Sequence, residues 1–281
     1  MAHASRLSPK ADRVSTVPLL PTRLIPPSRG LRGRLLLEAN MRRYVRHWLL
    51  LVTGFLEPLL FLLSIGVGLG GLIGDVHVDG MAVPYAAFVA PGLLATSAMN
   101  GAMIDSVFNL FFKLKITHSY DAILATPLST TDVVVGEVGW AIARGTLYAA
   151  TFILVMVALG DASSWMVICC LPACMLLSGS LAAIGAAATS YMRTWQDFDL
   201  VTLVQMPMFL FAGVFFPIAA YPTWLRTIVV LTPLYQGVAL CRGLSLGHLA
   251  PSMLLNVAYL IVFGALGMAV AIRRLTVLLV P

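Results

Sequence analysis

Long apolar runs recur along the chain after residue 48 and are separated by short polar segments. Because a transmembrane helix needs about 20 apolar residues at a rise of about 1.5 Å each, each run is long enough to cross a bilayer once. Six spans are predicted, at residues 48–74, 84–112, 133–159, 165–190, 200–217 and 251–272. The pattern therefore predicts an all-α polytopic membrane protein.

The segment between the fifth and sixth predicted spans, residues 217–250, is apolar but interrupted by Pro217, Pro222, Pro233 and several glycines. Because proline removes a backbone donor and breaks helices, one straight span is excluded. We expect short re-entrant half-helices in the outer leaflet, packed against protein, where non-helical backbone is tolerated.

The region before the first span divides into two parts. Residues 1–30 mix Pro, Ser and Arg without periodicity, which is typical of a flexible tail, here basic and cytosolic. Residues 31–47 separate apolar from arginine side chains, which predicts an amphipathic helix lying along the inner membrane surface. Residues 48–281 then form the six-helix transmembrane domain.

Composition agrees with the membrane interpretation. The 281 residues are 59% hydrophobic and only 11% charged, with a mean hydropathy of +0.92, whereas a soluble domain carries about 25% charged residues. Ten of the 18 Lys and Arg residues precede residue 48. A basic segment ahead of a span fits the positive-inside rule and anionic lipid, so no nucleic-acid partner is expected.

The distribution of basic residues also predicts the orientation. Fifteen of the 18 fall in segments that share one side, 1–47, 113–132, 191–199 and 273–281. The opposite side holds only Arg226 and Arg242, and Arg144 lies within a span. We therefore expect both ends of the chain to be cytosolic.

Nucleotide chemistry is not expected of this chain. The stretch "GVGLGG", residues 66–71, matches G-x-G-x-x-G but lies at the end of a predicted span with no strand before it. A phosphate-binding P-loop ends in Gly-Lys, and Lys10, Lys113 and Lys115 follow Pro, Phe and Leu. If ATP drives this protein, another subunit must hydrolyse it.

Catalytic and metal sites are equally unexpected. The histidines lie in the tail, at interfaces or in loops, and "SGS" at 178–180 has no partner base. Cys169, Cys170 and Cys174 have no nearby His, Asp or Glu to complete a metal site. A membrane-embedded lipid transferase would need such a motif, and a secondary transporter would show an inverted repeat that the chain lacks.

The inner loop "KLKITHSYDAILATPLSTTD", residues 113–132, contains a short amphipathic helix, "SYDAILA", that ends before Pro127. Two interpretations stay open. The helix is either an interfacial connector or a coupling helix, which binds a groove on a partner and transmits force to the spans.

Four ionisable residues fall inside the predicted spans. Their estimated depths from the inner helix ends are ~13 Å for Glu57, ~10 Å for Asp105, ~6 Å for Glu137 and ~16 Å for Arg144. Glu137 and Arg144 are seven residues apart and share a helix face. We expect the four to meet in the cytosolic half of the bilayer, as an interhelical lock or as part of gating or substrate passage.

Three stretches carry a resemblance to a known family: "YAAFVAPGLLATSAM" (85–99), "DAILATPLSTTDVVVGEV" (121–138) and "FAGVFFPIAAYPTWLRTIVVLTPLYQGVALCRG" (211–243). In order and spacing they resemble the ABC-2 family of exporter permeases, in particular the NodJ-like branch associated with lipo-oligosaccharide export. The resemblance covers roughly residues 31–275.

The resemblance implies a bacterial inner-membrane permease that pairs with a second copy or a related chain. Two copies of a separate cytosolic ATPase would bind ATP and Mg, so this chain itself needs no cofactor. The resemblance makes the inner loop a coupling element, with candidate residues Lys115, His118, Tyr120, Asp121, Ile123, Leu124 and Pro127. Where many relatives have an acidic-arginine cluster, this chain has Lys113-Leu114-Lys115 and His118.

The resemblance also places the substrate route at the dimer interface, where the second and fifth spans line up. The candidate pathway residues are Asn100, Asn109, Gln205, Phe209, Phe215 and Phe216. Met and aromatic side chains there make an apolar wall suited to an amphipathic or lipid-linked cargo, although ordinary packing also explains them. A drug or antibiotic cargo is the alternative.

Overall fold

The structure is a computed structural model that describes residues 36–42, 56, 59–65, 68, 70–78, 81–126, 128–161 and 164–279. These residues are almost all helical. The α-helices are α3 (Gly70–Ile73), α4 (Tyr85–Met103), α5 (Ser119–Leu124), α6 (Thr130–Leu159), α7 (Cys170–Thr189), α8 (Asp197–Phe211), α9 (Thr223–Val230), α10 (Pro233–Leu246) and α11 (Ser252–Leu279). Residues 36–42 are also helical.

Two wider π-helical stretches continue α4, namely η2 (Ile104–Asn109) and η3 (Phe112–Ile116). Short 3-10 turns precede α7 and α9, at η4 (Trp165–Cys169) and η5 (Ile218–Ala220). The predicted polar loop before the second span forms a hairpin instead. In it β1 (Asp75–Val78) pairs antiparallel with β2 (Met81–Pro84).

Among the described residues, four helices are long and apolar enough to cross a membrane: Tyr85–Ile116, Thr130–Leu159, Trp165–Thr189 and Ser252–Leu279. They correspond to the second, third, fourth and sixth predicted spans. A bend of 86° separates α9 from α10, as expected of two half-helices, and the pair makes a fifth candidate if it is counted as one broken span.

The predicted count of six spans stays a prediction. Much of the first predicted span, 48–74, lies outside the described residues. The fifth, 200–217, is helical only as α8, which has 15 residues and ends at Phe211. The entry of α9 and α10 into the outer leaflet also remains a prediction.

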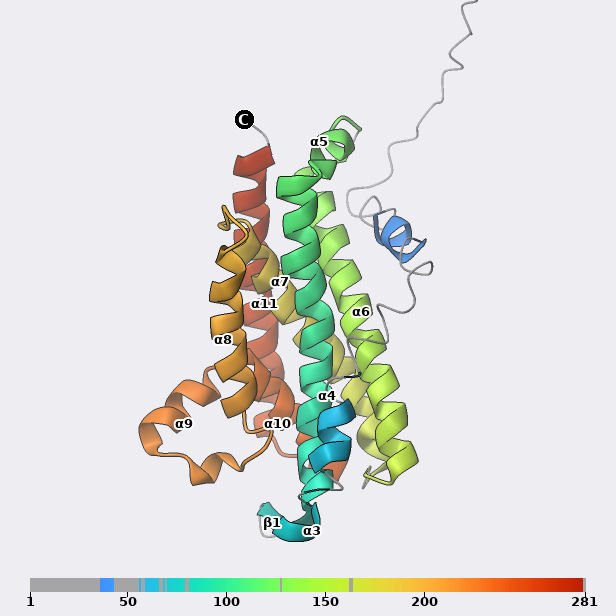
Figure 1. Cartoon of the computed structure of the whole chain (residues 1–281), viewed down its shortest axis with the longest axis vertical. Coiled ribbons are helices and arrows are strands. Elements are labelled where there is room, and N and C mark those ends of the chain that lie inside the picture. The colour runs from blue at the N-terminus through green and yellow to red at the C-terminus, as the bar shows by residue number, and fades with distance from the viewer. Residues whose placement is uncertain are drawn as a thin grey trace, which may run out of the picture.

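The long helices α4, α6, α7 and α11 pack side by side, and α8 lies at one side of this bundle (Figure 1). One end of the molecule carries α5 and the C-terminal end of α11. The other end carries the hairpin, α3 and α9 (Figure 1). We call these the α5 end and the α9 end.

Small residues allow the long helices to approach closely. A Cβ added to Gly101 would lie 2.9 Å from Cα of Gly145, and one added to Gly145 would lie 2.7 Å from the carbonyl oxygen of Ala98. On α11, a Cβ on Gly264 would lie 3.1 Å from Cα of Ser180. Because lipid tails give helices no hydrophobic drive to associate, such close contacts are a main source of stability.

The helix ends follow from local sequence. Ser129 and Asp132 form a capping box at the start of α6, and Gly160 ends this helix with a φ of 82°. Thr232 caps α10 by accepting a hydrogen bond from the backbone N–H of Tyr235, with Pro233 in the first turn. These residues set where α6 and α10 begin, and therefore where the segments that contain α5 and α9 join them.

We expect Gly145→Ala to destabilise the protein by about 1–3 kcal/mol, because the new methyl group meets both the Ser178 side chain on α7 and the backbone carbonyl oxygen of Ala98 on α4. Gly179→Ala is the matched control, since its Cβ would meet only the end of the Ile142 side chain, at 3.2 Å. Thermal unfolding of both variants in detergent tests this. Equal midpoints would contradict the close packing of α4 and α6.

Candidate functional site

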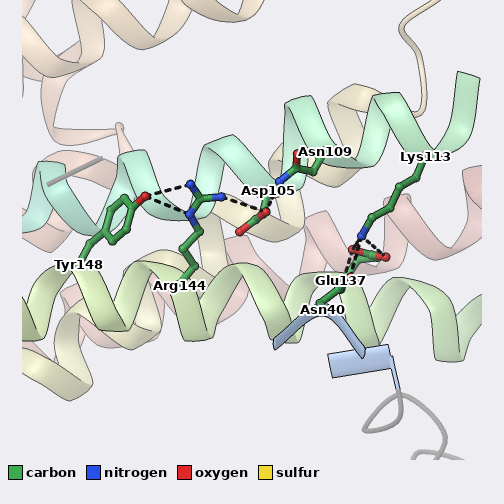
Figure 2. Close-up of polar contacts among 7 residues, drawn as sticks. All are labelled: Asn40, Asp105, Asn109, Lys113, Glu137, Arg144 and Tyr148. Carbon is green, nitrogen blue, oxygen red and sulfur yellow. Dashed lines mark hydrogen bonds and ion pairs between the residues drawn. The ribbon is translucent and has the colours of Figure 1, made fainter. Parts of the chain in front are cut away.

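A buried ion pair joins the middle of α6 to the π-helical continuation of α4. Nη1 of Arg144 lies 3.2 Å from Oδ1 of Asp105, and the two side chains are only 3% and 2% exposed. The Asn109 amide donates a hydrogen bond to Asp105, and the Tyr148 hydroxyl accepts from Nε and Nη2 of Arg144, at 3.1 and 2.9 Å (Figure 2). We call this group the central cluster.

A second polar group lies nearer the α5 end. Nζ of Lys113 lies 2.7 and 2.8 Å from the two carboxylate oxygens of Glu137. Asn40 completes the group, because its amide nitrogen donates to Glu137 at 3.3 Å and its amide oxygen accepts from Lys113 at 3.1 Å (Figure 2). This inner cluster ties the helical segment 36–42 to α4 and α6.

The prediction of one joint cluster is therefore wrong for Glu137. The predicted pairing of Arg144 with an acid is confirmed by Asp105, but Glu137 pairs with Lys113. Seven residues separate Glu137 from Arg144 along α6, which is about 10.5 Å of rise, so each needs a partner at its own level. Glu57 lies outside the described residues.

The π-helical stretches explain how one helix supplies both partners. Asp105 and Lys113 are eight residues apart, and in a regular α-helix eight residues overshoot two full turns by about 80°. Hydrogen bonds from residue i+5 to residue i widen the turns of η2 and η3 and take up this excess. Both side chains consequently face α6.

The short helix predicted in the inner loop is present as α5, and one side of it packs against the bundle. Tyr120 is 1% exposed and lies in a hydrophobic cluster with Val133 and Val134 of α6. Ile123 and Leu124 are half-buried and pack against the same cluster. The buried side of α5 is thus packed directly against the start of α6.

The other candidate coupling residues are placed differently. His118 is exposed and has a φ of 46°, which marks the sharp turn between η3 and α5. Lys115 is half-buried, and Ala122 is exposed on α5. The side chain of Asp121 and the whole of Pro127 lie outside the described part of the chain.

A cavity of about 760 Å³ lies between α8, α7 and the α4–η2 junction. Its walls are mostly apolar, whereas the end near the loop between α7 and α8 is polar, with Arg193, Thr194 and Asp197. The apolar lining includes Met103, Val107, Leu181, Ile184, Ala188, Leu200, Val201, Val204, Met208 and Phe263. The cavity is therefore amphipathic along its length.

Contacts at three levels hold α8 against the bundle. At its first turn, the Phe198 ring stacks on Phe108 with centroids 4.6 Å apart and meets Phe111 edge-on at 4.9 Å. In the middle, Nε2 of Gln205 donates to Oδ1 of Asn100 at 3.2 Å. Beyond the far end, the rings of Phe209 and Phe215 lie edge to face at 5.3 Å, beside Phe61.

These contacts show where the six predicted pathway residues lie in the structure. Asn100 and Gln205 are brought together, as are Phe209 and Phe215, whereas Asn109 belongs to the central cluster and Phe216 is exposed. Of the six, Gln205 lines the cavity. The aromatic group around Phe198 was not singled out from the sequence, where Phe108 and Phe111 fall in the second predicted span and Phe198 just before the fifth.

We expect Arg144→Ala to destabilise the protein by about 3–5 kcal/mol, because Asp105 would keep a buried charge without its cation. Arg226→Ala is the control, since that side chain is exposed on α9 and its loss is worth less than about 0.5 kcal/mol. The yield of monodisperse protein and its thermal midpoint in detergent measure the difference. Equal values would contradict the lock.

The sequence of this chain is also similar to those of known proteins. The model of the ABC-2 type transporter family matches residues 33–246. Nodulation protein J of Rhizobium leguminosarum bv. viciae is 30% identical over 240 residues, covering 84% of this chain and 91% of that protein. Nodulation protein J of Sinorhizobium fredii is 30% identical over 211 residues, or 75% of this chain and 79% of that protein.

A third relative has a name that describes transport. The inner membrane transport permease YadH of Escherichia coli is 27% identical over 199 residues, covering 69% of this chain and 75% of that protein. The family match covers well over half of the chain and includes the helical segment 36–42, both polar clusters, α5 and α8. The chain belongs to the ABC-2 type transporter family of membrane permeases.

Proposed function

We propose that this chain is the permease subunit of an ATP-driven exporter in a bacterial inner membrane. Its cargo is an amphipathic, lipid-linked or lipo-oligosaccharide molecule, which it moves from the cytoplasm or the inner leaflet to the outside. The supporting observation is the cavity beside α8, whose walls are apolar and whose end near the α7–α8 loop is polar.

The chemistry of this cavity suits an amphiphile. Met103, Met208 and Phe263 give an adaptable apolar wall that accepts an acyl chain without a fixed shape. At the polar end, Asp197 accepts hydrogen bonds from the backbone N–H groups of Arg193 and Thr194, at 2.6 and 3.0 Å. The cavity volume of about 760 Å³ lies within the range of binding sites for drug-sized ligands. A longer cargo would therefore occupy the cavity with only part of its length at any one time.

Energy would come from a separate subunit. The sequence has no Gly-Lys pair for a P-loop, so two copies of a cytosolic ATPase would bind ATP and Mg. A second permease, identical or related, would complete the transporter. With the α5 end cytosolic, as the basic residues predict, the ATPase would meet α5 and both chain ends.

Movement of α5 would reach the cavity through contacts already described. Tyr120 and the start of α6 share one hydrophobic cluster, and α6 carries both Glu137 and Arg144, which bind η3 and η2. Residues of η2 and its neighbours, including Val107, line the cavity. Closure of the ATPase would therefore shift the cavity wall between inward-open and outward-open arrangements.

Filling the cavity should block transport. We expect Ala188→Phe to lower substrate export several-fold, because the ring occupies the space between α7 and α8. Ala265→Phe is the matched control, since Ala265 is exposed on α11 outside the cavity. The assay uses vesicles containing the permease with its ATPase and compares a fluorescent lipo-oligosaccharide with a hydrophobic drug.

Loss of export of the lipo-oligosaccharide in Ala188→Phe alone supports the proposal. Export of the drug but not of the lipo-oligosaccharide by the unmodified protein would favour a drug-efflux function. Equal export by both variants would remove this cavity from the pathway.

Substitutions on the outer side of α5 should release the ATPase. We expect Ala122→Glu to reduce its co-purification strongly, because the added charge lies on the exposed face while Tyr120 keeps the helix anchored. Asp121→Ala and Pro127→Ala are expected to act in the same direction. Thr227→Glu, on an exposed position of α9, is the control at the opposite end. Undiminished co-elution with Ala122→Glu would exclude α5 as the contact.

A further inference from the structure

A second cavity, of about 480 Å³, lies at the α9 end of the molecule. It is formed by α10, the first turns of α11, the segment after α8 and the side chain of Phe88 on α4. In contrast to the cavity beside α8, it is lined by many polar side chains, namely Tyr235, Gln236, Arg242, His248, Ser252 and Asn256. None of its lining residues is an Asp or a Glu.

Arg242 is held in this cavity entirely by neutral groups. Its Nε donates to the carbonyl oxygen of Phe88 at 3.2 Å, and its Nη2 donates to those of Gly213 and Val214 at 2.7 and 3.4 Å. The guanidinium carbon lies 3.9 Å from the centre of the Phe88 ring. Within the described residues, Nη1 donates no hydrogen bond and no carboxylate forms an ion pair with this side chain.

Two cations that lie between α6 and the continuation of α4 have a different environment. Arg144 and Lys113 each face a carboxylate on the neighbouring helix, which offsets the cost of removing charge from water. The carbonyl groups around Arg242 orient the guanidinium but leave its net charge in place. A positive charge in a cavity without acids attracts an anion, and a guanidinium binds phosphate through charge-assisted hydrogen bonds.

The surroundings indicate the source of that anion. Large apolar side chains are exposed on α9, on α11 and on the connections beside the cavity, at Trp224, Ile228, Leu231, Leu249, Leu254 and Leu255. An exposed apolar surface with a Trp on a short helix is typical of the boundary between lipid and water. A ligand with an anionic headgroup and an acyl chain matches both parts.

We propose that the Arg242 cavity binds the phosphate group of an amphiphile, with the headgroup on Nη1 and the chain along the apolar surface of α9. The site is separate from the cavity beside α8, because the two share no lining residue. It requires no ATPase and no transport, so its test is independent of the export proposal.

The experiment measures binding to the purified full-length chain in a non-ionic detergent. The probes are short-chain phosphatidylglycerol, phosphatidylcholine with the same acyl chains, and inorganic phosphate. We expect phosphatidylglycerol to bind preferentially, and Arg242→Gln to weaken its binding about tenfold, the loss of one charge-assisted hydrogen bond. Arg226→Gln, which removes an exposed arginine of α9 outside the cavity, should bind like the unmodified protein.

A second variant keeps the test valid if Arg242→Gln fails to fold, since Arg242 also holds the segment after α8. Ala239→Phe fills the cavity from α10 and leaves Arg242 and its carbonyl partners in place. We expect the same loss of binding from it. Preference for inorganic phosphate, equal affinity for the two lipids, or full binding by Ala239→Phe would each overturn the proposal.

Discussion

The packing of α4 against α6 depends on the rule that a charge buried between these two helices is neutralised by a partner at its own level. Removing an ion from water costs several kcal/mol, and only a close counter-charge with further hydrogen bonds offsets this. Asp105 and Arg144 satisfy the rule in the middle of the bundle, and Lys113 and Glu137 satisfy it near the α5 end. Together they fix the register of α4 against α6.

This register connects the helical segment 36–42, α5 and the cavity beside α8. Asn40 extends the inner cluster to the segment that precedes the bundle, and Tyr120 anchors α5 beside it. On the other face of α4 and η2, Met103 and Val107 line the cavity beside α8. α4 and its π-helical continuation therefore contact α5, the ion pairs and the cavity.

The two cavities differ in a way that suits vectorial movement of an amphiphile. The cavity beside α8 is apolar with a polar end, and one of its walls includes η2, which the Asp105–Arg144 ion pair joins to α6. The cavity at the α9 end is polar and contains one arginine held only by neutral groups. A molecule with a chain and a headgroup finds complementary surfaces in both.

Much of the fold follows from the apolar pattern, because long runs specify spans directly. The third span was predicted at 133–159 and is found at Thr130–Leu159, and the Pro-rich segment does contain a sharp bend between α9 and α10. The pairing of Glu137 with Lys113 could not be predicted from the sequence. It depends on π-helical turns, and a search for the 3.6-residue period of an α-helix does not reveal them. The Asp75–Pro84 hairpin was missed for a related reason, since four-residue strands leave too short a pattern.

The wide turns of η2 and η3 also change the direction in which the side chains after α4 point. Each π-helical turn holds an additional residue relative to an α-turn, so the side chains around Lys113 face a different direction from the one that a regular continuation of the helix before Ile104 would give them. Migration of such a turn along the chain rotates one part of the helix relative to the other while every backbone amide keeps an acceptor. The wide turns are thus located where the ion pairs and the cavity wall meet.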